Sequence, residues 1–170
     1  MQKMHGAHQL KKIVVNTGIG RLATSNAGFE EKVLPGIVEE FKSIIGQHPA
    51  FRRARTSVAG FKIREGMVIG LSATMRGKRM HGFLARLNAI VFPRVRDFRG
   101  IPLKNIDENG NLNIGIREHT AFPEIFPETS KIDFGLQVTI VPNAKNKEQA
   151  VAMYRSLGIP LQKEKLNPKP

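Results

Sequence analysis

The chain has no cysteine and no tryptophan, and aromatic residues make up only 6% of its 170 residues. Without cysteine there is no disulfide, no thiolate zinc site and no cysteine nucleophile. Because aromatic side chains are scarce, base stacking on a sheet platform is not expected to be the main mode of any RNA binding. The missing disulfides also fit a reducing compartment, so we expect an intracellular protein and not a secreted one.

Long apolar runs are missing as well. No segment approaches the roughly 18 consecutive apolar residues of a membrane helix, and the N-terminal MQKMHGAHQLKK has no apolar run of signal-peptide length. We therefore expect a soluble protein with no membrane partner. The length suits one domain over residues 1–170, with flexible ends at 1–9 and 163–170.

Acidic residues are few, and the resulting positive charge is concentrated in the middle of the chain. Lys and Arg number 27 against 14 Asp and Glu, which gives a formal net charge of +13. Residues 51–99 carry twelve of these cations against two carboxylates, and ten of the twelve are arginine. Guanidinium groups make bidentate phosphate contacts and stack on bases better than lysine does. This pattern predicts a polyanionic partner, with nucleic acid ahead of a membrane surface.

Hydrophobic periodicity predicts an α+β fold. Five segments have the composition or alternation of strands, namely 10–16, 49–55, 68–76, 111–117 and 134–141. In the third segment Thr74 and Arg76 fall on the polar side of the alternation and should point away from the core. We expect a curved antiparallel sheet of about five strands, with helices packed on one face and a projecting arm at 56–67. The other face or an edge would remain free to bind.

Helical spacing of apolar residues marks three segments. The first runs from Phe29 to Ile45, should kink or restart at Pro35-Gly36, and can be terminated by Gly46. The second runs from Met80 to Val91 and should end before Pro93. The third opens at Asn146, which with Gln149 resembles a capping box, and runs to Leu157.

The stretch KIVVNTGIGRLA contains Gly18-x-Gly20-x-x-Ala23, the fingerprint of dinucleotide-binding folds. Such a fold needs a helix that starts at the second glycine and an acidic residue at the end of the next strand. The sequence predicts neither, because the helical pattern begins near Phe29 and the next strand ends in arginine. An NADP-linked or RNA-modifying enzyme is therefore only the alternative interpretation. The glycines would instead make a turn or let RNA approach the backbone closely.

Other catalytic and metal-binding patterns are absent. Gly77-Lys78 lacks the upstream glycine of a phosphate-binding loop, and there is no Gly-x-Ser-x-Gly elbow. His5 and His8 have ligand-like spacing but lie at the N-terminus, and the remaining histidines, His48, His81 and His119, are far apart. Glu65 and Asp97 look like local partners of arginines. We expect no enzyme, no cofactor and no metal.

Several stretches together resemble the family of large ribosomal subunit protein five, the 5S rRNA-binding protein, in its bacterial-type form. They fall in family order between residues 10 and 160. The stretches are KIVVNTGIG, IIGQHPAFRRARTSVAGFKIREGMVIGLSATMRGKRMHGFLARL, FPRVRDFRGI, NGNLNIGIREHTAFPEI and AKNKEQAVAMYRSLGIP.

The resemblance implies a structural protein that binds 5S rRNA and anchors it in the central protuberance, against the large-subunit rRNA. An arm would reach the P-site tRNA and the small-subunit head, where small-subunit protein thirteen is the partner. Neighbouring 5S rRNA-binding ribosomal proteins are further expected partners. The protein would work in a cytoplasmic ribosome, with an organellar ribosome left open.

By motif match, the resemblance assigns 5S rRNA recognition to Asn16 in VVN, Gln47 in IIGQ and Thr74 in SATMR. Considered alone, the residues allow a second interpretation, in which each is a cap or turn residue. The arginine-rich segment adds expected rRNA contacts, which are Arg52, Arg53, Arg55, Arg76, Lys78 and Arg79. Arg94, Arg96 and Arg99 either contact rRNA or hold their loop by pairing with Asp97, and we expect a mixture.

The tRNA-facing part of the arm is expected to comprise Thr56, Ser57, Val58, Ala59, Gly60, Phe61, Lys62 and Arg64. Lys62 and Arg64 would contact phosphates, and Gly60 and Gly66 would permit the bend. For Phe61, anchoring the arm is favoured over stacking on a base.

The chain departs from the family pattern in three places. Family members usually carry a helix ahead of the first strand, whereas this chain begins almost at the strand. The segment between Gly20 and Gly46 is longer than the family pattern, so the first helix could be displaced. The charged C-terminal tail is also extended and could follow rRNA.

Overall fold

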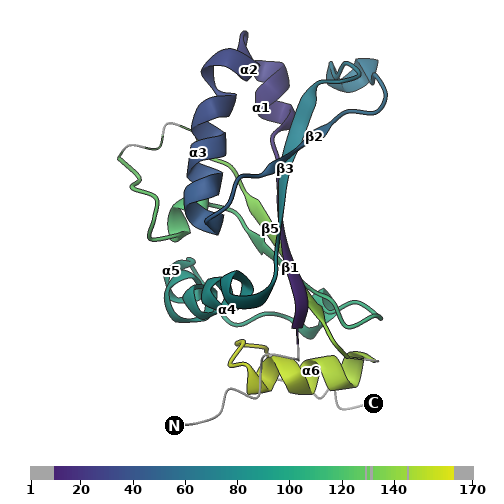
Figure 1. Cartoon of the computed structure of the whole chain (residues 1–170), viewed down its shortest axis with the longest axis vertical. Helices are drawn as coiled ribbons and strands as arrows, with labels where there is room; N and C mark the ends of the chain where they lie inside the picture. Colours follow the sequence, from purple (N-terminus) through teal and green to yellow (C-terminus); the bar gives the residue numbers. More distant parts are fainter. Residues whose placement is uncertain (1–9, 129, 131, 145, 163–170) are drawn as a thin grey trace, which may run out of the picture.

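A five-stranded antiparallel sheet is the centre of the computed structural model, which describes residues 10–162 except 129, 131 and 145 (Figure 1). The order of the strands across the sheet is β2-β3-β1-β5-β4, and every neighbouring pair is antiparallel. The strands are β1 (Leu10–Gly18), β2 (Ala50–Arg53), β3 (Val68–Met75), β4 (Leu112–Ile116) and β5 (Leu136–Pro142). The predicted α+β fold is confirmed.

Helices cover one face of this sheet. They are α1 (Gly20–Ser25), α2 (Phe29–Lys32), α3 (Leu34–Ile45), α4 (Gly77–Arg86), α5 (Phe92–Arg94) and α6 (Lys147–Ser156). Figure 1 shows α3, α4 and α5 on one side of the sheet and α6 near its lower end. Among the described residues, no helix is long and apolar enough to cross a membrane.

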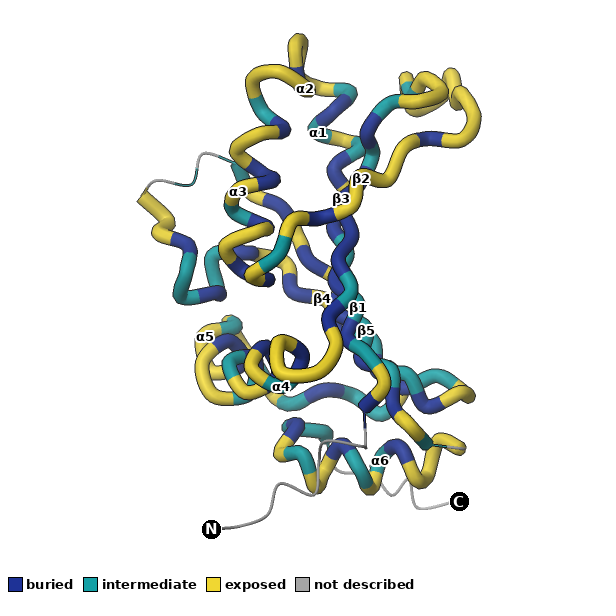
Figure 2. Tube along the Cα trace, viewed as in Figure 1, coloured by how far each residue is buried: buried dark blue, intermediate teal, exposed yellow. Residues whose placement is uncertain are grey.

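Alternation along the strands separates a buried face from an uncovered one. In β1, Ile13 and Val15 have no exposed surface, whereas Val14 and Asn16, which alternate with them, are half-buried. Figure 2 shows buried and intermediate colours in turn along the central strands. The same alternation buries Val138 and Ile140 of β5 under the helices. Because successive strand residues point to opposite faces, the intervening polar side chains face away from the core.

The interruption of the first long helix occurs where it was predicted. α2 ends at Lys32, and α3 begins at Leu34 with Pro35 in its first turn, where the missing N–H of proline costs nothing. Gly46 then ends α3 in the left-handed conformation, at φ 76°. Both predictions are confirmed.

The expectation that no helix starts at Gly20 is wrong. α1 begins at Gly20 and buries Ala23. Its last turn is stabilised by polar side chains: the Ser25 hydroxyl donates to the Arg21 carbonyl at 2.8 Å, and the Asn26 amide donates to the Leu22 carbonyl at 2.9 Å. Side-chain bonds of this kind satisfy the carbonyls that a helix end leaves free.

The second helix does not end before Pro93. α4 passes into a π-helical turn at Leu87–Val91, and α5 follows with Pro93 in its first turn. Proline is tolerated at the start of a helix, so the change of helical repeat lets the chain remain helical through Pro93 to Arg94. The buried Phe92 stacks on Phe98 with ring centroids 4.9 Å apart, which supports this extension.

The C-terminal helix α6 is capped at its start, as predicted, and is anchored by Tyr154. The Asn146 side chain accepts a hydrogen bond from the Gln149 backbone N–H at 3.0 Å, which confirms the predicted cap. Tyr154 is fully buried, and its hydroxyl lies 2.7 Å from the Gly110 carbonyl and 3.0 Å from the Ile140 carbonyl. The phenol therefore ties α6 to the end of β5.

Tyr154 makes the stability of the fold depend on pH in the alkaline range. Burial raises the pKa of its phenol above the ordinary value of about 10. A raised pKa means that folding favours the neutral phenol, so this stabilisation is complete below about pH 10 and is lost as the pH rises toward the folded-state pKa. Tyr154 is the only tyrosine. Phenolate absorbance should therefore stay low above pH 10 while the protein remains folded.

A Tyr154→Phe variant provides the control. It removes the hydroxyl from two buried carbonyls and should lower the free energy of unfolding by about 1–3 kcal/mol at neutral pH. Compared with the wild type in denaturant titrations, it should lose less stability between about pH 10 and 11, because lysines titrate equally in both proteins. An ordinary phenol titration in the folded wild type would contradict this account.

Candidate nucleic-acid interface

The uncovered sheet face carries rows of polar side chains that cross the strands. Residues directly opposite each other in an antiparallel pair point to the same face, so the register defines these rows. One row contains Thr74, Val14, Thr139 and Asn113, and the next contains Ser72, Asn16, Gln137 and Gly115. The face is thus lined mainly with hydroxyl and amide groups and not with aromatic rings.

The three residues assigned to 5S rRNA by motif lie close together, with Asn16 and Thr74 on this face and Gln47 bonded to the backbone of β3. Asn16 is directly opposite Ser72, two residues from Thr74 on β3, so Asn16 and Thr74 are diagonal neighbours. Gln47 follows the end of α3, and its side-chain amide donates to the Thr74 carbonyl at 3.2 Å. Its carbonyl oxygen lies 3.5 Å from an Arg79 nitrogen.

The sequence left open whether these residues are caps or turn residues or are free to contact RNA, and their contacts in the structure differ in this respect. Gln47 has a structural part, because it connects the end of α3 to β3. Asn16 is not a helix cap, since Ile19 is the N-cap of α1. Within the part of the chain that the structure describes, no hydrogen bond involves the Asn16 side chain, so its amide can serve an external partner.

Arginines border the face at the edge strand β2 and at the start of α4. Arg52 donates to the Ser72 hydroxyl at 3.2 Å, and Arg53 donates to the Gly66 carbonyl at 2.8 Å. Arg76 is the N-cap of α4, and the first turn of this helix has no acidic residue but contains Lys78. Cations placed at the positive end of a helix dipole repel each other and favour an anionic ligand.

The arm leaves the sheet between β2 and β3 and ends in a tight turn. Its base is held by backbone hydrogen bonds from Ala54 to Met67 and from Gly66 to Ala54, and its tip by two bonds between Val58 and Ile63. A 3₁₀ helix at Ala59–Phe61 forms the tip. In Figure 1 the arm projects at the upper right, away from α3.

The anchoring role favoured for Phe61 is wrong. Its side chain is 72% exposed, and no residue of the 3₁₀ helix is buried. The bend depends on Gly66, at φ 82°, and on Lys62, which adopts a left-handed φ of 54°. Gly60 has no positive φ, so only one of the two predicted glycines is needed for its conformational freedom.

The acidic residues of the basic segment do not pair with arginines. Within the described ranges, the ion pairs are Lys42–Glu39, Arg86–Glu124, His119–Glu40 and His119–Asp133. Neither Glu65 nor Asp97 takes part, so the pairing expected for them is wrong. Arg94 and Arg96 instead line a groove of about 910 Å³ with Arg117 and the exposed Phe126.

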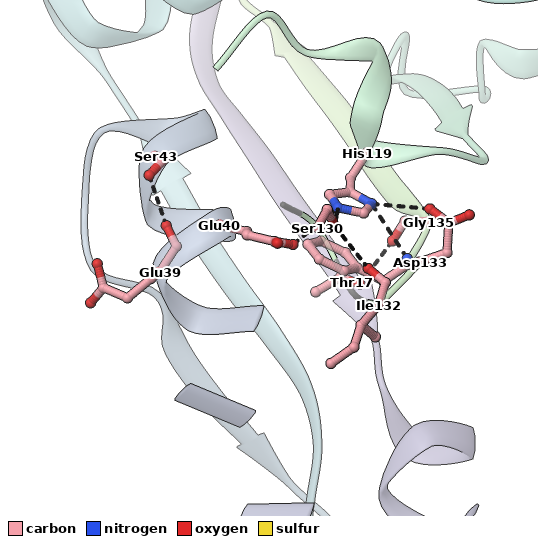
Figure 3. Close-up of polar contacts among 10 residues, drawn as sticks. Thr17, Glu39, Glu40, Ser43, His119, Ser130, Ile132, Asp133 and Gly135 are labelled. Atoms are coloured by element: carbon pink, nitrogen blue, oxygen red, sulfur yellow. Dashed lines mark hydrogen bonds and ion pairs between the residues drawn. The ribbon is translucent and has the colours of Figure 1, made fainter. Parts of the chain in front are cut away.

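His119 is fully buried and is the centre of a polar cluster, not of a metal site (Figure 3). Its Nε2 lies 3.0 Å from a Glu40 oxygen and 2.9 Å from the Ser130 hydroxyl, while its Nδ1 lies 3.4 Å from an Asp133 oxygen. Because the two carboxylates lie at different ring nitrogens, they do not converge on one ion. Across the described residues, no group of three or more histidines or carboxylates could hold a metal; His5 and His8 lie outside them.

The dinucleotide-binding alternative fails on topology. That fold requires a helix that connects two parallel strands, with the phosphates at the start of the helix. Here α1 does begin at Gly20, but it leads into α2 and α3, and β1 is antiparallel to both of its neighbours. The fingerprint Gly18-x-Gly20-x-x-Ala23 therefore lies outside any βαβ unit.

Comparisons with known proteins identify one family over nearly the whole chain. Residues 5–64 match "Ribosomal protein L5", and residues 68–161 match the model for the C-terminus of the same ribosomal family. The chain is 46% identical over 154 residues to large ribosomal subunit protein uL5 of Halothermothrix orenii, covering 89% of this chain and 82% of the relative. It is 43% identical over 159 residues to large ribosomal subunit protein uL5c of Guillardia theta, covering 92% and 84%.

A third relative gives the same result. The chain is 44% identical over 153 residues to large ribosomal subunit protein uL5 of Brachyspira hyodysenteriae, covering 89% of this chain and 79% of the relative. Identity of this level over most of both chains extends the agreement from single motifs to the whole fold. The chain therefore belongs to the ribosomal protein L5 family and is an RNA-binding structural constituent of the large ribosomal subunit.

Proposed function

We propose that the chain binds 5S rRNA with the uncovered face of its sheet and anchors it to large-subunit rRNA in the central protuberance. The observation that carries this proposal is that Asn16 and Thr74 are diagonal neighbours on that face and that Gln47 bonds the Thr74 carbonyl. The neighbouring proteins that bind 5S rRNA are proposed partners, in a cytoplasmic or an organellar ribosome.

The chemistry of the face suits RNA. Amide and hydroxyl groups can hydrogen-bond base edges and 2′-hydroxyls, which a purely basic surface cannot distinguish. Arg52 at the edge strand and Arg76, Lys78 and Arg79 at α4 can hold the phosphates on either side. Arg53 and Arg55 extend this basic border toward the arm.

The first test is the salt dependence of 5S rRNA binding. If arginines neutralise several phosphates, log affinity should fall linearly with log salt, by about 0.7–0.9 per phosphate. Arg52→Ala and Arg76→Ala should each reduce this slope by about one phosphate. Lys42→Ala on α3, which lies on the helical side, is the matched control and should leave the slope unchanged. A flat salt response, or equal affinity for unrelated RNA, would refute the proposal.

The second test removes the polar groups singly. Asn16→Ala and Thr74→Val should each weaken 5S rRNA binding by about 1–3 kcal/mol if the side chain contacts RNA directly. Gln47→Ala should also weaken it, because it releases both the Thr74 carbonyl and Arg79. Ser43→Ala on α3 is the control. If filter-binding affinities of all three variants equal that of the wild type, this site assignment is wrong.

We further propose that the arm at residues 56–67 contacts the P-site tRNA and, at the small-subunit head, small-subunit protein thirteen. The support is the exposed tip, where Phe61 lies beside Lys62 and close in sequence to Arg64. An exposed ring can stack on a base or pack against an apolar group, and the two cations can contact phosphates.

The arm can be tested in assembled ribosomes. Phe61→Ala should weaken P-site tRNA binding by about 1–3 kcal/mol if the ring stacks on a base, without changing 5S rRNA binding or the stability of the free protein. Ile90→Ala, which truncates an exposed apolar residue outside the arm, is the control and should leave tRNA binding unchanged. Unchanged tRNA affinity in both Phe61→Ala and the Lys62→Ala/Arg64→Ala pair would exclude the proposed tRNA contact.

A further inference from the structure

The uncovered face continues beyond Asn16 across β5 and β4, where the family resemblance assigns no role. Two hollows lie there. One of about 420 Å³ is lined by residues that include Lys104, Asn113, Gly115 and Gln137. The other, of about 320 Å³, is lined by residues that include Asn16, Gly115, Arg117 and Gln137. Gly115 and Gln137 are directly opposite in the β4–β5 ladder and border both hollows.

Amide side chains are concentrated around these hollows. Gln137 is exposed and lies directly opposite Asn16, so the two amides are neighbours on the same face. Within the described residues, neither side chain makes a hydrogen bond, which leaves each with a donor and an acceptor for a ligand. Neither amide costs the fold anything by remaining unpaired, because both reach solvent.

Asn113 is the third amide, and the protein holds it in place. The Thr139 hydroxyl donates to the Asn113 side-chain oxygen at 2.8 Å. With one end of the amide fixed, the NH₂ group at the other end is presented to a ligand as an oriented donor. Thr139 is therefore a positioning residue for Asn113.

We propose that Gln137 and Asn113, together with Asn16, form an amide-lined site that hydrogen-bonds unpaired nucleotides of the bound RNA. This inference rests on the proposed 5S rRNA-binding function and extends its contact face across the whole sheet. Adjacent amides match the donor and acceptor pattern of base edges and of the 2′-hydroxyl. Arg117 and Lys104 lie at the borders, where phosphates of the same strand would be held.

Unpaired nucleotides fit this site better than a regular duplex does. The amides project from a pleated sheet surface, and a sheet cannot enter the deep, narrow major groove of an RNA helix. Bases splayed out of a loop can instead lie against the strands. Gly115 leaves room for this approach, since a Cβ built there would have no neighbouring atom within 4 Å.

The experiment measures 5S rRNA affinity of the full chain across a salt series for Gln137→Ala, Asn113→Ala and Gly115→Val. Each should bind 5S rRNA about 5- to 150-fold more weakly, the range expected for a lost base contact. The salt slope should not change, because no cation is removed. Affinity for an unrelated RNA should also not change, so the preference for 5S rRNA should fall.

Matched controls exclude a general effect of substitution. Gln149→Ala removes an exposed amide from α6, and Gly36→Val adds the same side chain to α3, where a Cβ also has open space. Both should bind as the wild type does. Gln137→Glu should bind more weakly than Gln137→Ala, because a carboxylate beside the RNA backbone is repelled.

Thr139→Val tests whether Thr139 orients the Asn113 amide or contacts the RNA itself. It should weaken binding in the wild-type background but not in the Asn113→Ala background, because Thr139 acts through Asn113. If the wild type prefers 5S rRNA and the Gln137, Asn113 and Gly115 variants keep that preference, the amide site is refuted while the proposed function stands. If the wild type itself shows no preference, the proposed function fails first.

Discussion

The register of the central strand β1 is the constraint on which the rest of the structure depends. β1 is hydrogen-bonded on both edges, to β3 and β5, and its odd-numbered residues Ile13 and Val15 are fully buried. A shift of one residue would move Asn16 into the core and expose these side chains. The same alternation along β1 therefore decides which residues enter the hydrophobic core and which lie on the polar face.

An antiparallel sheet can leave one face in water, and this property makes the proposed RNA interface possible. The helices that follow β1 and β3 return to the same side, which leaves hydroxyl and amide groups on the other. Different residues can then provide the affinity for RNA and the specificity for one RNA sequence. Arginines of β2 and α4 border the face and can supply phosphate contacts, while neutral side chains on the strands can distinguish one RNA from another.

Local signals predicted most of the fold, whereas contacts between distant segments explain the errors. Strand alternation, the Asn146 cap and the helix restart at Pro35 depend on neighbouring residues, and all are confirmed. The extension of the helix through Pro93 depends on a change of helical repeat, and the exposure of Phe61 depends on how far the arm projects. The position of Gln137 and Asn113 close to Asn16 could not be predicted, because alternation along a strand does not show which strands lie beside each other.

The glycines of KIVVNTGIGRLA show why a motif has meaning only within a topology. Gly20 begins a helix, as a nucleotide-binding turn requires, but a Cβ there would make only an ordinary contact with Ile69, at 3.6 Å, and Gly20 has no positive φ. Gly18 has open space above it, and its partner Gly70 could not carry a Cβ, which would lie 2.9 Å from the Thr17 carbonyl. In a βαβ unit of a parallel sheet, glycines at this spacing would form the turn that binds a pyrophosphate. Here β1 runs antiparallel to both neighbours, so no pyrophosphate-binding turn forms. The open space at Gly18, on the same face as Asn16, is instead what the proposed RNA contact would use for a close approach to the backbone.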